Sequence, residues 1–415
     1  MFLKIAFFSE VPTFNPIFPN GISSFIEAIS RYLTKIGHSV EIYEGKTHFG
    51  QKQEQVVHKN ITIHRLFSLP ISSYQNFRIS FAIGSVFKGI KEEVDVVHAH
   101  GPMNGIAASM VGRKQNVPKI ITYHTPSTQY REYCPPFLAP FGTRAFLEWA
   151  ERTVYNAFDL ITTPAAKWKE NLIKEGFDAH KIFVLPNCVN LEENNIRITP
   201  EYTQKLRDRY ELNGKRVVVY VGRMSPEKKI PDIIKLVPKV IKEEPDTHFL
   251  MVGKGPYLDQ YREMAARVAP RDITFTGYVS DKDLSNIMQM SNLGLIFANG
   301  AQVFDITLLN YWSNSLAVCA RRAGGMGDVI EHSQNGMLFE KCNDACAYII
   351  NLLQDQNFCN KIGKNGYMTV KNKYSVEAVS KQLLSLYNLA AHEFHKPGDT
   401  IFSHIWRYLT KNRKN

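Results

Sequence analysis

Apolar residues recur along the chain in short unbroken runs, which alternate with longer stretches where apolar residues stand three or four positions apart. Unbroken runs are typical of strands buried on both faces of a parallel sheet, and the longer spacing is typical of amphipathic helices. The predicted strands cover residues 3–8, 40–43, 61–66, 94–98, 120–123, 160–163 and 182–185, and then 217–221, 249–252, 273–276, 293–297 and 316–320.

Helical spacing fills the gaps between these runs. It predicts helices over residues 22–33, 79–91, 105–115, 142–157 and 376–392. Strands that alternate with helices predict right-handed βαβ units and hence an α/β fold of doubly wound parallel sheets. The segment 191–215 is polar and rich in charge, so we place a linker there, with domains over 1–200 and 201–375 and a final segment over 376–415.

Length and composition agree with two globular domains. The chain has 415 residues, of which 44% are hydrophobic and 21% are charged. A chain of this length exceeds what one core usually supports. No apolar run reaches the roughly 18 residues of a membrane span, and we interpret the first residues as a buried strand rather than a signal peptide. Scattered cysteines predict free thiols in a reducing cytoplasm.

The net charge of +11 predicts a polyanionic partner. Nucleic acid, an anionic membrane and a phosphorylated substrate are the three classes that such a charge attracts. The chain shows no zinc-knuckle spacing and no aromatic and basic sheet signature. We therefore expect no nucleic acid, and favour a phosphorylated substrate together with a membrane surface.

The stretch VVVYVGRMSPEKK over residues 217–229 carries the clearest chemistry. Its apolar half is a predicted strand that stops at Gly222, where a tight turn begins at the edge of the sheet that binds ligands in open α/β folds. Arg223 and Lys228 follow, just before a predicted helix whose amino terminus favours an anion. The stretch predicts a diphosphate clamp, and the alternative is a solvated basic turn.

Other polar residues also follow predicted strands in the first half of the chain. They are His98 and His100 in VVHAHGP, His124 in ITYHTPS and Asn187 in VLPNCVN. Functional groups gather at such edges because the loops converge there. Within this set, His98 and His100 are the weaker candidates, and we interpret them as structural residues. Gly21 opens the first predicted helix and can admit a phosphate or a sugar close to the backbone, although a single glycine is a weak signal.

Taken together, these motifs resemble family 4 of the retaining, nucleotide-sugar-dependent glycosyltransferases, which have the GT-B fold of two Rossmann-like domains. The resemblance runs to about Asn388 and includes the motifs VGRMSPEKK, MVGKGP, FTGYVS, AGGMGDVIEHSQNGMLF, HAHGP, TYHTPS and VLPNCVN. It implies an acceptor-side first domain, a nucleotide-sugar-binding second domain, and a crossing helix that returns to the first domain before a basic tail.

The resemblance also implies roles for individual residues. Arg223 and Lys228 would hold the diphosphate in place of a metal ion, so we expect no metal and no cofactor beyond the donor substrate, a UDP-sugar. His124 would lie beside the donor sugar, the alternative being a histidine that caps its strand. Tyr278 would line the base, the alternative being packing in the core. The nucleoside pocket would be shaped by Gly222, Gly253, Gly255 and Tyr278.

One part of the pattern departs from the family. Members carry two glutamates separated by seven residues, and the matching positions here hold Gln302 and Asn310. An amide can exchange hydrogen bonds with ribose or sugar hydroxyls, but it supplies no negative charge to an oxocarbenium-like transition state. Asp305 either restores a charge one turn away or obstructs the donor. A slow transferase and an inactive binding scaffold both remain open.

The acceptor side of the resemblance points to lipid. An aromatic and apolar loop over residues 130–141 matches the region that faces the membrane in lipid-directed members, and residues 402–414 form a basic amphipathic pattern. The alternatives are packing of this loop on the first domain and a docked terminal helix. We therefore expect a lipid or glycan acceptor, an anionic membrane surface as partner, and a cytoplasmic protein that is peripheral at the inner face of the membrane.

Overall fold

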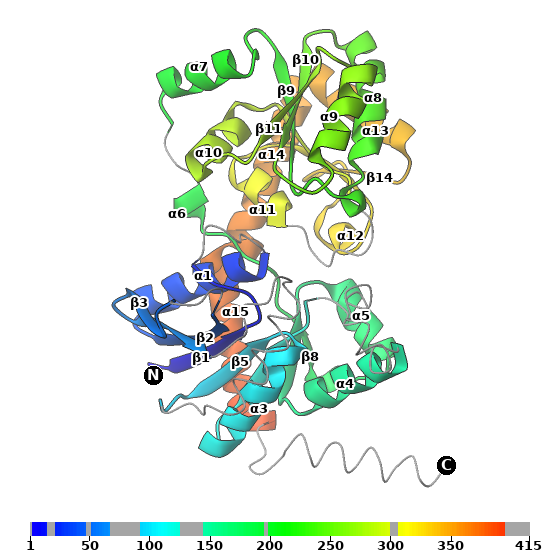
Figure 1. Cartoon of the computed structure of the whole chain (residues 1–415). Helices are drawn as coiled ribbons and strands as arrows, with labels where there is room; N and C mark the ends of the chain where they lie inside the picture. Colours follow the sequence, from blue (N-terminus) through cyan, green and yellow to red (C-terminus); the bar gives the residue numbers. More distant parts are fainter. Residues whose placement is uncertain are drawn as a thin grey trace. The chain divides into compact units, whose positions relative to one another are not determined.

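The computed structural model describes residues 2–14, 21–46, 51–66, 92–124, 144–194, 198–298 and 306–394. The contacts among these residues divide the chain into two units (Figure 1). The first unit holds the residues up to Pro186 and those from Val379 onward, and the second unit is Asn187–Ala378. Each unit is built around one sheet.

The first sheet has the strand order β3-β4-β2-β1-β5-β6-β7-β8. Its neighbours pair in parallel except β3 and β4, which are antiparallel. Most residues of the parallel strands are buried, as the unbroken runs predicted, and all residues of β5, β6 and β7 are buried on both faces. The strands are β1 (Lys4–Ser9), β2 (Ser39–Gly45), β3 (Glu54–His58), β4 (Ile61–Leu66), β5 (Val96–His100), β6 (Lys119–Thr122), β7 (Leu160–Thr163) and β8 (Ile182–Val184).

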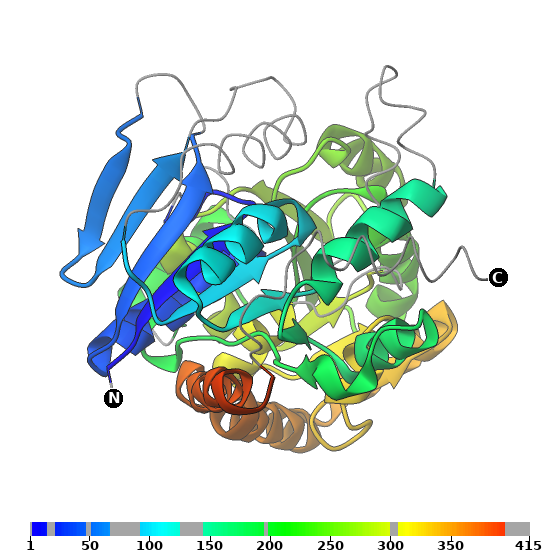
Figure 2. The same cartoon turned by 90° about the horizontal axis from the view of Figure 1, so that it is seen from below.

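Strand β3 is an element that the sequence pattern did not predict. It forms a hairpin with β4 at the outer edge of the sheet (Figure 2). Its side chains are almost all exposed, so it has no apolar run that periodicity can detect. The predicted parallel-sheet fold is confirmed, and β3 adds one antiparallel pair at its edge, because a hairpin strand needs no buried face.

The helices of the first unit follow the predicted spacing where the structure describes it. The predicted helix at 105–115 begins three residues earlier, at Pro102, whose fixed backbone suits the first turn of a helix. The predicted helix at 79–91 lies outside the described residues. The helices are α1 (Gly21–Lys35), α3 (Pro102–Gln115), α4 (Arg144–Asn156), α5 (Ala166–Lys174), the short η3 (Ala179–Lys181), and, at the end of the chain, α15 (Val376–Leu389) and η6 (Ala390–Phe394).

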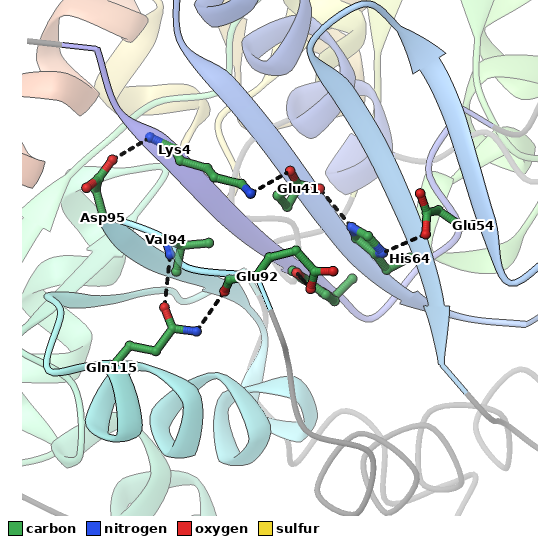
Figure 3. A network of polar contacts seen from close by, with 9 residues as sticks. Lys4, Glu41, Glu54, His64, Glu92, Val94, Asp95 and Gln115 are labelled. Carbon is green, nitrogen blue, oxygen red and sulfur yellow. Dashed lines mark hydrogen bonds and ion pairs between the residues drawn. The ribbon is translucent and has the colours of Figure 1, made fainter.

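A row of charged side chains runs across the neighbouring strands β1, β2 and β4 of the first sheet (Figure 3). Lys4 donates from its backbone to Asp95 at 2.7 Å, and its amine lies 3.3 Å from Glu41. Glu41 accepts in turn from His64 at 2.7 Å. These contacts join β1, β2 and β4 through pairs that neighbouring strands bring together, each worth about 0.2–1 kcal/mol.

The second sheet has the order β11-β10-β9-β12-β13-β14, and all of its pairs are parallel. Strand β14 was not predicted, because three buried residues are too short for a periodic signal. The strands are β9 (Arg216–Val221), β10 (Thr247–Val252), β11 (Ile273–Gly277), β12 (Leu293–Ile296), β13 (Val318–Arg321) and β14 (Met337–Phe339).

Helices cover both faces of the second sheet (Figure 1). Val218 and Tyr220 of β9 pack on one face with α8, α9 and α13, while Val217 and Val219 pack on the other with α7, α10 and α11. The helices are α6 (Leu191–Asn194), α7 (Pro200–Arg209), η4 (Pro226–Lys228), α8 (Ile230–Glu243), α9 (Leu258–Val268), α10 (Asp281–Met290), α11 (Ile306–Ser313), α12 (Met326–Val329), α13 (Cys342–Gln354), α14 (Gln356–Thr369) and η5 (Val370–Tyr374).

The charge-rich segment 191–215, where we predicted the linker, contains helix α7. Thr199 caps this helix by accepting from the backbone of Tyr202. Leu206 and Leu212 are buried in the core of the second unit, and Arg207 donates to the carbonyl of Leu212 at 2.7 Å. The helix is mostly polar because only a narrow stripe of it faces the core.

A buried ion pair holds the loop that follows β1. The carboxylate of Glu44 accepts from the backbone N–H and the hydroxyl of Thr13, both at 2.7 Å, and from Nε of Arg65 at 3.0 Å. Glu44 and Arg65 are 1% and 5% exposed. Burial raises the pKa of Glu44, although the donors from Thr13 and Arg65 oppose that rise.

We predict that Arg65→Met lowers the free energy of unfolding by about 3–5 kcal/mol, because it leaves the buried Glu44 carboxylate with its Thr13 donors but without the cation that balances its charge. Urea unfolding at neutral pH measures the loss. The double change Glu44→Gln with Arg65→Met should recover part of it, and Lys167→Met, which removes an exposed pair with Glu170, should change little. A loss below about 1 kcal/mol in the single variant would contradict the account.

Candidate active site

Three loops meet at the carboxyl ends of β9, β10 and β11. The backbone N–H of Gly222 donates to the carbonyl of Val252 at 3.0 Å, and that of Gly253 donates to the carbonyl of Gly277 at 2.9 Å. The three strands are neighbours in the sheet, so their ends lie along one edge. Direct hydrogen bonds therefore hold the predicted site loops together.

Gly253 and Gly255 are required by the close approach of two of these loops. A Cβ atom on Gly253 would collide with the carbonyl oxygen of Gly222, and one on Gly255 would collide with that of Met224. Gly253 also has a φ of +136°, which other residues rarely adopt. The structure thus gives both glycines a packing role, while their predicted role around a nucleoside stays a prediction.

Arg223 lies in the loop after β9 and is held by an acidic neighbour. Its guanidinium lies 3.0 Å from Glu227, which also accepts from the hydroxyl of Ser225 at 2.5 Å. Partial burial tends to raise the pKa of Glu227, but the Ser225 hydroxyl, a backbone N–H and Arg223 hold that pKa below its ordinary value. Arg223 is 69% exposed, so its pair with Glu227 contributes little to stability.

Lys228 differs from Arg223 in its surroundings. It is the last residue of η4 and only 9% of it is exposed. Lys229 follows in the left-handed region with a φ of +55°, and α8 begins at Ile230. The predicted arrangement of two cations between a strand end and a helix start is present, with one cation buried and the other exposed.

Tyr278 stands directly after β11 and is 55% exposed. The alternative that its ring packs in the core is therefore wrong. The amine of Lys254 lies 5.9 Å from the centre of the ring, on the loop after β10. Sequence reasoning did not single out Lys254, which carries no signal beyond its place between two glycines.

Asn310 lies on α11, which is fastened to the end of β9 by its neighbour. The buried hydroxyl of Tyr311 accepts from the backbone N–H of Val221 at 2.8 Å and lies 3.2 Å from the carbonyl of Val219, to which it donates. The carbonyl of Asn310 accepts from Asn314 at 2.9 Å, close to the end of the helix. Gln302 and Asp305 lie outside the described residues.

In the first unit, His124 stands at the carboxyl end of β6, two residues beyond Thr122. Its Nε2 lies 3.1 Å from Nδ1 of His100, and the two rings are nearly parallel. Sequence reasoning treated His100 as a weak, structural candidate and did not connect it with His124. Gly21 is the exposed first residue of α1, and a Cβ there would meet no atom within 4 Å.

His98 and His100 are both fully buried and neutral. Burial lowers the pKa of His98 to about 3, with a smaller contribution from His124. Burial, and then the neighbouring His98 and His124, hold the pKa of His100 well below 6.5. The ring nitrogens of His98 lie 2.9 Å from the hydroxyl of Tyr387 and 2.7 Å from that of Thr122, so His98 is a satisfied core residue, as predicted.

Among the described residues, no group of three or more His, Cys, Asp or Glu side chains is placed to hold a metal ion. No helix of the described parts of the chain is long and apolar enough to cross a membrane.

Comparison with known protein families identifies the class of this chain. Residues 19–193 match the model described as Glycosyltransferase Family 4, and residues 203–369 match the model described as Glycosyl transferases group 1. The chain therefore belongs to the family 4 glycosyltransferases and has their GT-B fold, with two parallel-sheet α/β domains. It is a transferase of glycosyl groups.

Individual relatives agree with this assignment. The chain is 23% identical to the alpha-monoglucosyldiacylglycerol synthase of Acholeplasma laidlawii over 93% of its own length and 96% of the relative. It is 26% identical to the sulfoquinovosyl transferase SQD2 of Arabidopsis thaliana over 87% of its length and 69% of that protein. These identities show that the proteins are related, but they do not show that this chain uses the same acceptor as its relatives.

Solved structures share the fold. The chain matches sucrose-phosphate synthase from Thermosynechococcus elongatus with a TM-score of 0.74 and 17% identity, covering 93% of this chain and 98% of that one. It matches Anabaena HepE in complex with UDP with a TM-score of 0.71 and 16% identity, covering 94% and 100%.

We predict that Gly255→Ala separates the loops after β9 and β10, because the new methyl group meets the carbonyl of Met224. The expected loss is about 1–3 kcal/mol of unfolding free energy, the usual cost of overpacking, measured by urea unfolding. Gly327→Ala is the matched control, since the nearest atom to a Cβ there, on Arg322, is 3.7 Å away. Equal effects of the two variants would argue against the loop contact.

Proposed function

We propose that this chain is a retaining hexosyltransferase that moves a hexose from a UDP-sugar to a hydroxyl of a lipid at a membrane surface. The loop after β9 carries the proposal, because it holds Arg223 and Lys228 between the end of a central strand and the start of α8. The UDP bound to the similar HepE structure and the lipid named in the Acholeplasma relative support the two substrates.

The proposed chemistry at this loop is the stabilisation of a leaving group. As the bond between the sugar and the diphosphate breaks, negative charge grows on the diphosphate oxygens. Arg223 can meet these oxygens with two parallel N–H groups, and Lys228 adds a point charge from a site that is largely shielded from water. Cations fixed before the reaction lower the barrier because they need not reorganise. No metal or cofactor is part of this proposal.

The sugar side of the proposal relies on hydrogen bonds. His124 would hold a hydroxyl of the donor sugar, and Tyr278, whose ring is exposed after β11, would line the base. Gln302 and Asn310 would take hydroxyls that carboxylates hold in the family, with Asp305 nearby in the sequence. The amides supply no negative charge to the transition state, so we expect slow transfer with retention of the anomeric configuration.

The acceptor and the place of action follow from charge and kinship. A net charge of +11 favours an anionic surface, and the Acholeplasma relative is named for a diacylglycerol glycolipid. We propose a peripheral protein at the cytoplasmic face of the membrane. The aromatic loop at 130–141 and the tail at 402–414, which would contact lipid, lie outside the described residues.

A second candidate function is a binding scaffold without turnover. The replacement of both family glutamates by Gln302 and Asn310 is the observation that favours it. Such a protein would keep the loop after β9 and bind a nucleotide, but it would transfer no sugar.

We predict that Arg223→Ala and Lys228→Ala each weaken UDP binding by about 1.5–3 kcal/mol, the value of a charge-assisted hydrogen bond. Isothermal titration with UDP measures the effect. Arg262→Ala is the control, because Arg262 forms an exposed pair with Asp259 on α9 and should leave affinity unchanged. Unchanged affinity in both loop variants would remove the diphosphate clamp from the account.

Turnover separates the transferase from the scaffold. We expect UDP-sugars to raise the stability of the chain by about 2.7 kcal/mol at 100 times the dissociation constant. We also expect slow transfer of hexose to diacylglycerol in vesicles that contain anionic lipid. The double variant Gln302→Glu with Asn310→Glu should change the barrier by no more than about 2.7–4 kcal/mol. Binding without any transfer would favour the scaffold, and no binding of any donor to a folded sample would exclude the transferase and leave a scaffold that binds another partner.

A further inference from the structure

The ring of His100 is held in one orientation at the end of β5. It is fully buried and stacks on His98, with ring centres 4.5 Å apart and an angle of 24° between the planes. Phe7 and Phe25 lie against it, with ring centres at 5.5 and 5.7 Å. Four aromatic rings thus pack together, and rotation of His100 would break these contacts.

Among the residues that the structure describes, the side chain of His100 has one polar contact, with His124. Nδ1 of His100 lies 3.1 Å from Nε2 of His124, and the rings are inclined by 27°. His100 pairs in register with Thr122, so His124 comes two residues further along the neighbouring strand. A hydrogen bond between two imidazoles needs one nitrogen with a proton and one without.

The surroundings of His100 decide which nitrogen carries its proton. Because burial keeps His100 neutral, its ring holds a single proton. Its other nitrogen, Nε2, is buried and has no partner in the described part of the chain. If the proton were on Nε2, a buried N–H group would lack an acceptor. If the proton is on Nδ1, Nε2 carries only a lone pair. Orphaned buried N–H groups are the rarer case, so the proton belongs on Nδ1.

His98 makes no hydrogen bond that would affect which nitrogen of His100 carries the proton. Both of its ring nitrogens already contact hydroxyl groups, those of Tyr387 and Thr122, and the Thr122 hydroxyl also lies 2.8 Å from that of Thr162. Hydroxyls can donate or accept, so these contacts satisfy either tautomer of His98. His98 therefore supports His100 by stacking alone.

We propose that His100 is a positioning residue that donates from Nδ1 to Nε2 of His124, and so fixes both the ring orientation and the tautomer of His124. His124 then carries its own proton on Nδ1 and acts as a hydrogen-bond donor there. A histidine that is set by a second histidine behind it follows the same logic as a metal-bound histidine set by its outer partner. The catalytic part of this inference rests on the proposed function, whereas the tautomer does not.

The tautomer can be measured on the full chain without any substrate. Two-dimensional NMR of protein labelled with ¹⁵N-histidine separates protonated from bare ring nitrogens, and the signals absent from His124→Gln belong to His124. We expect the proton of His124 on Nδ1. His100→Phe keeps an aromatic ring in the stack but has no donor, so His124 should return to the Nε2–H form that free histidine favours. His100→Asn can place an amide N–H where Nδ1 was, and should preserve the Nδ1–H form.

Activity provides the second measurement. We expect His100→Phe to reduce the rate of donor turnover by about tenfold to a hundredfold, as lost outer partners do elsewhere, with UDP affinity unchanged. His100→Asn should restore most of the rate. An Nε2 proton on His124 in the unaltered chain, or no change of tautomer in His100→Phe, would overturn the proposal, and the unaltered chain suffices if a variant fails to fold. If neither the unaltered chain nor its variants turn over any donor, but the tautomer of His124 is as expected, the proposed function fails and the positioning contact stands.

Discussion

The second unit depends on a contact between two stretches of backbone. The loops after β9 and β10 approach so closely that Gly253 and Gly255 leave no room for a Cβ atom. Hydrogen bonds from Gly222 and Gly253 then join these loops and the end of β11. Arg223 and Lys228 follow directly from this edge, Arg223 on the exposed side and Lys228 buried. Under the proposed function, these two cations would meet the oxygens of a departing diphosphate.

Arg223 and the two buried histidines have opposite surroundings, and desolvation explains the difference in their charge. Arg223 keeps its charge because it remains in water, where its pair with Glu227 contributes little to stability. His98 and His100 are buried and lose their charge, since a lone cation in the core is too costly. A neutral histidine can only donate from one nitrogen and accept at the other. Burial therefore turns His100 into a residue with a definite hydrogen-bond direction toward His124.

Much of the fold was predictable because its strands are buried on both faces. The run from Val217 to Val221 corresponds to β9 almost residue for residue, and its alternate side chains enter two different cores. Strand β3 was missed because its side chains are exposed and it is held by pairing with β4. Helix α7 was assigned to a linker because it is rich in charged residues and buries a single residue, Leu206. The periodicity of apolar residues indicates which positions are buried. It therefore does not detect an exposed element that is held by hydrogen bonds.

By itself, the sequence determined which residues stand at the ends of strands, since an apolar run and the glycine or polar residue that stops it are local features. It thereby placed Arg223, Lys228, Tyr278 and His124 at strand ends, and motif order identified the family. Only the tertiary structure decided which of these residues meet. His100 and His124 are neighbours because β5 and β6 are adjacent in the sheet order. That order depends on how whole faces of the sheet are buried by helices, and no single stretch of the chain carries this information.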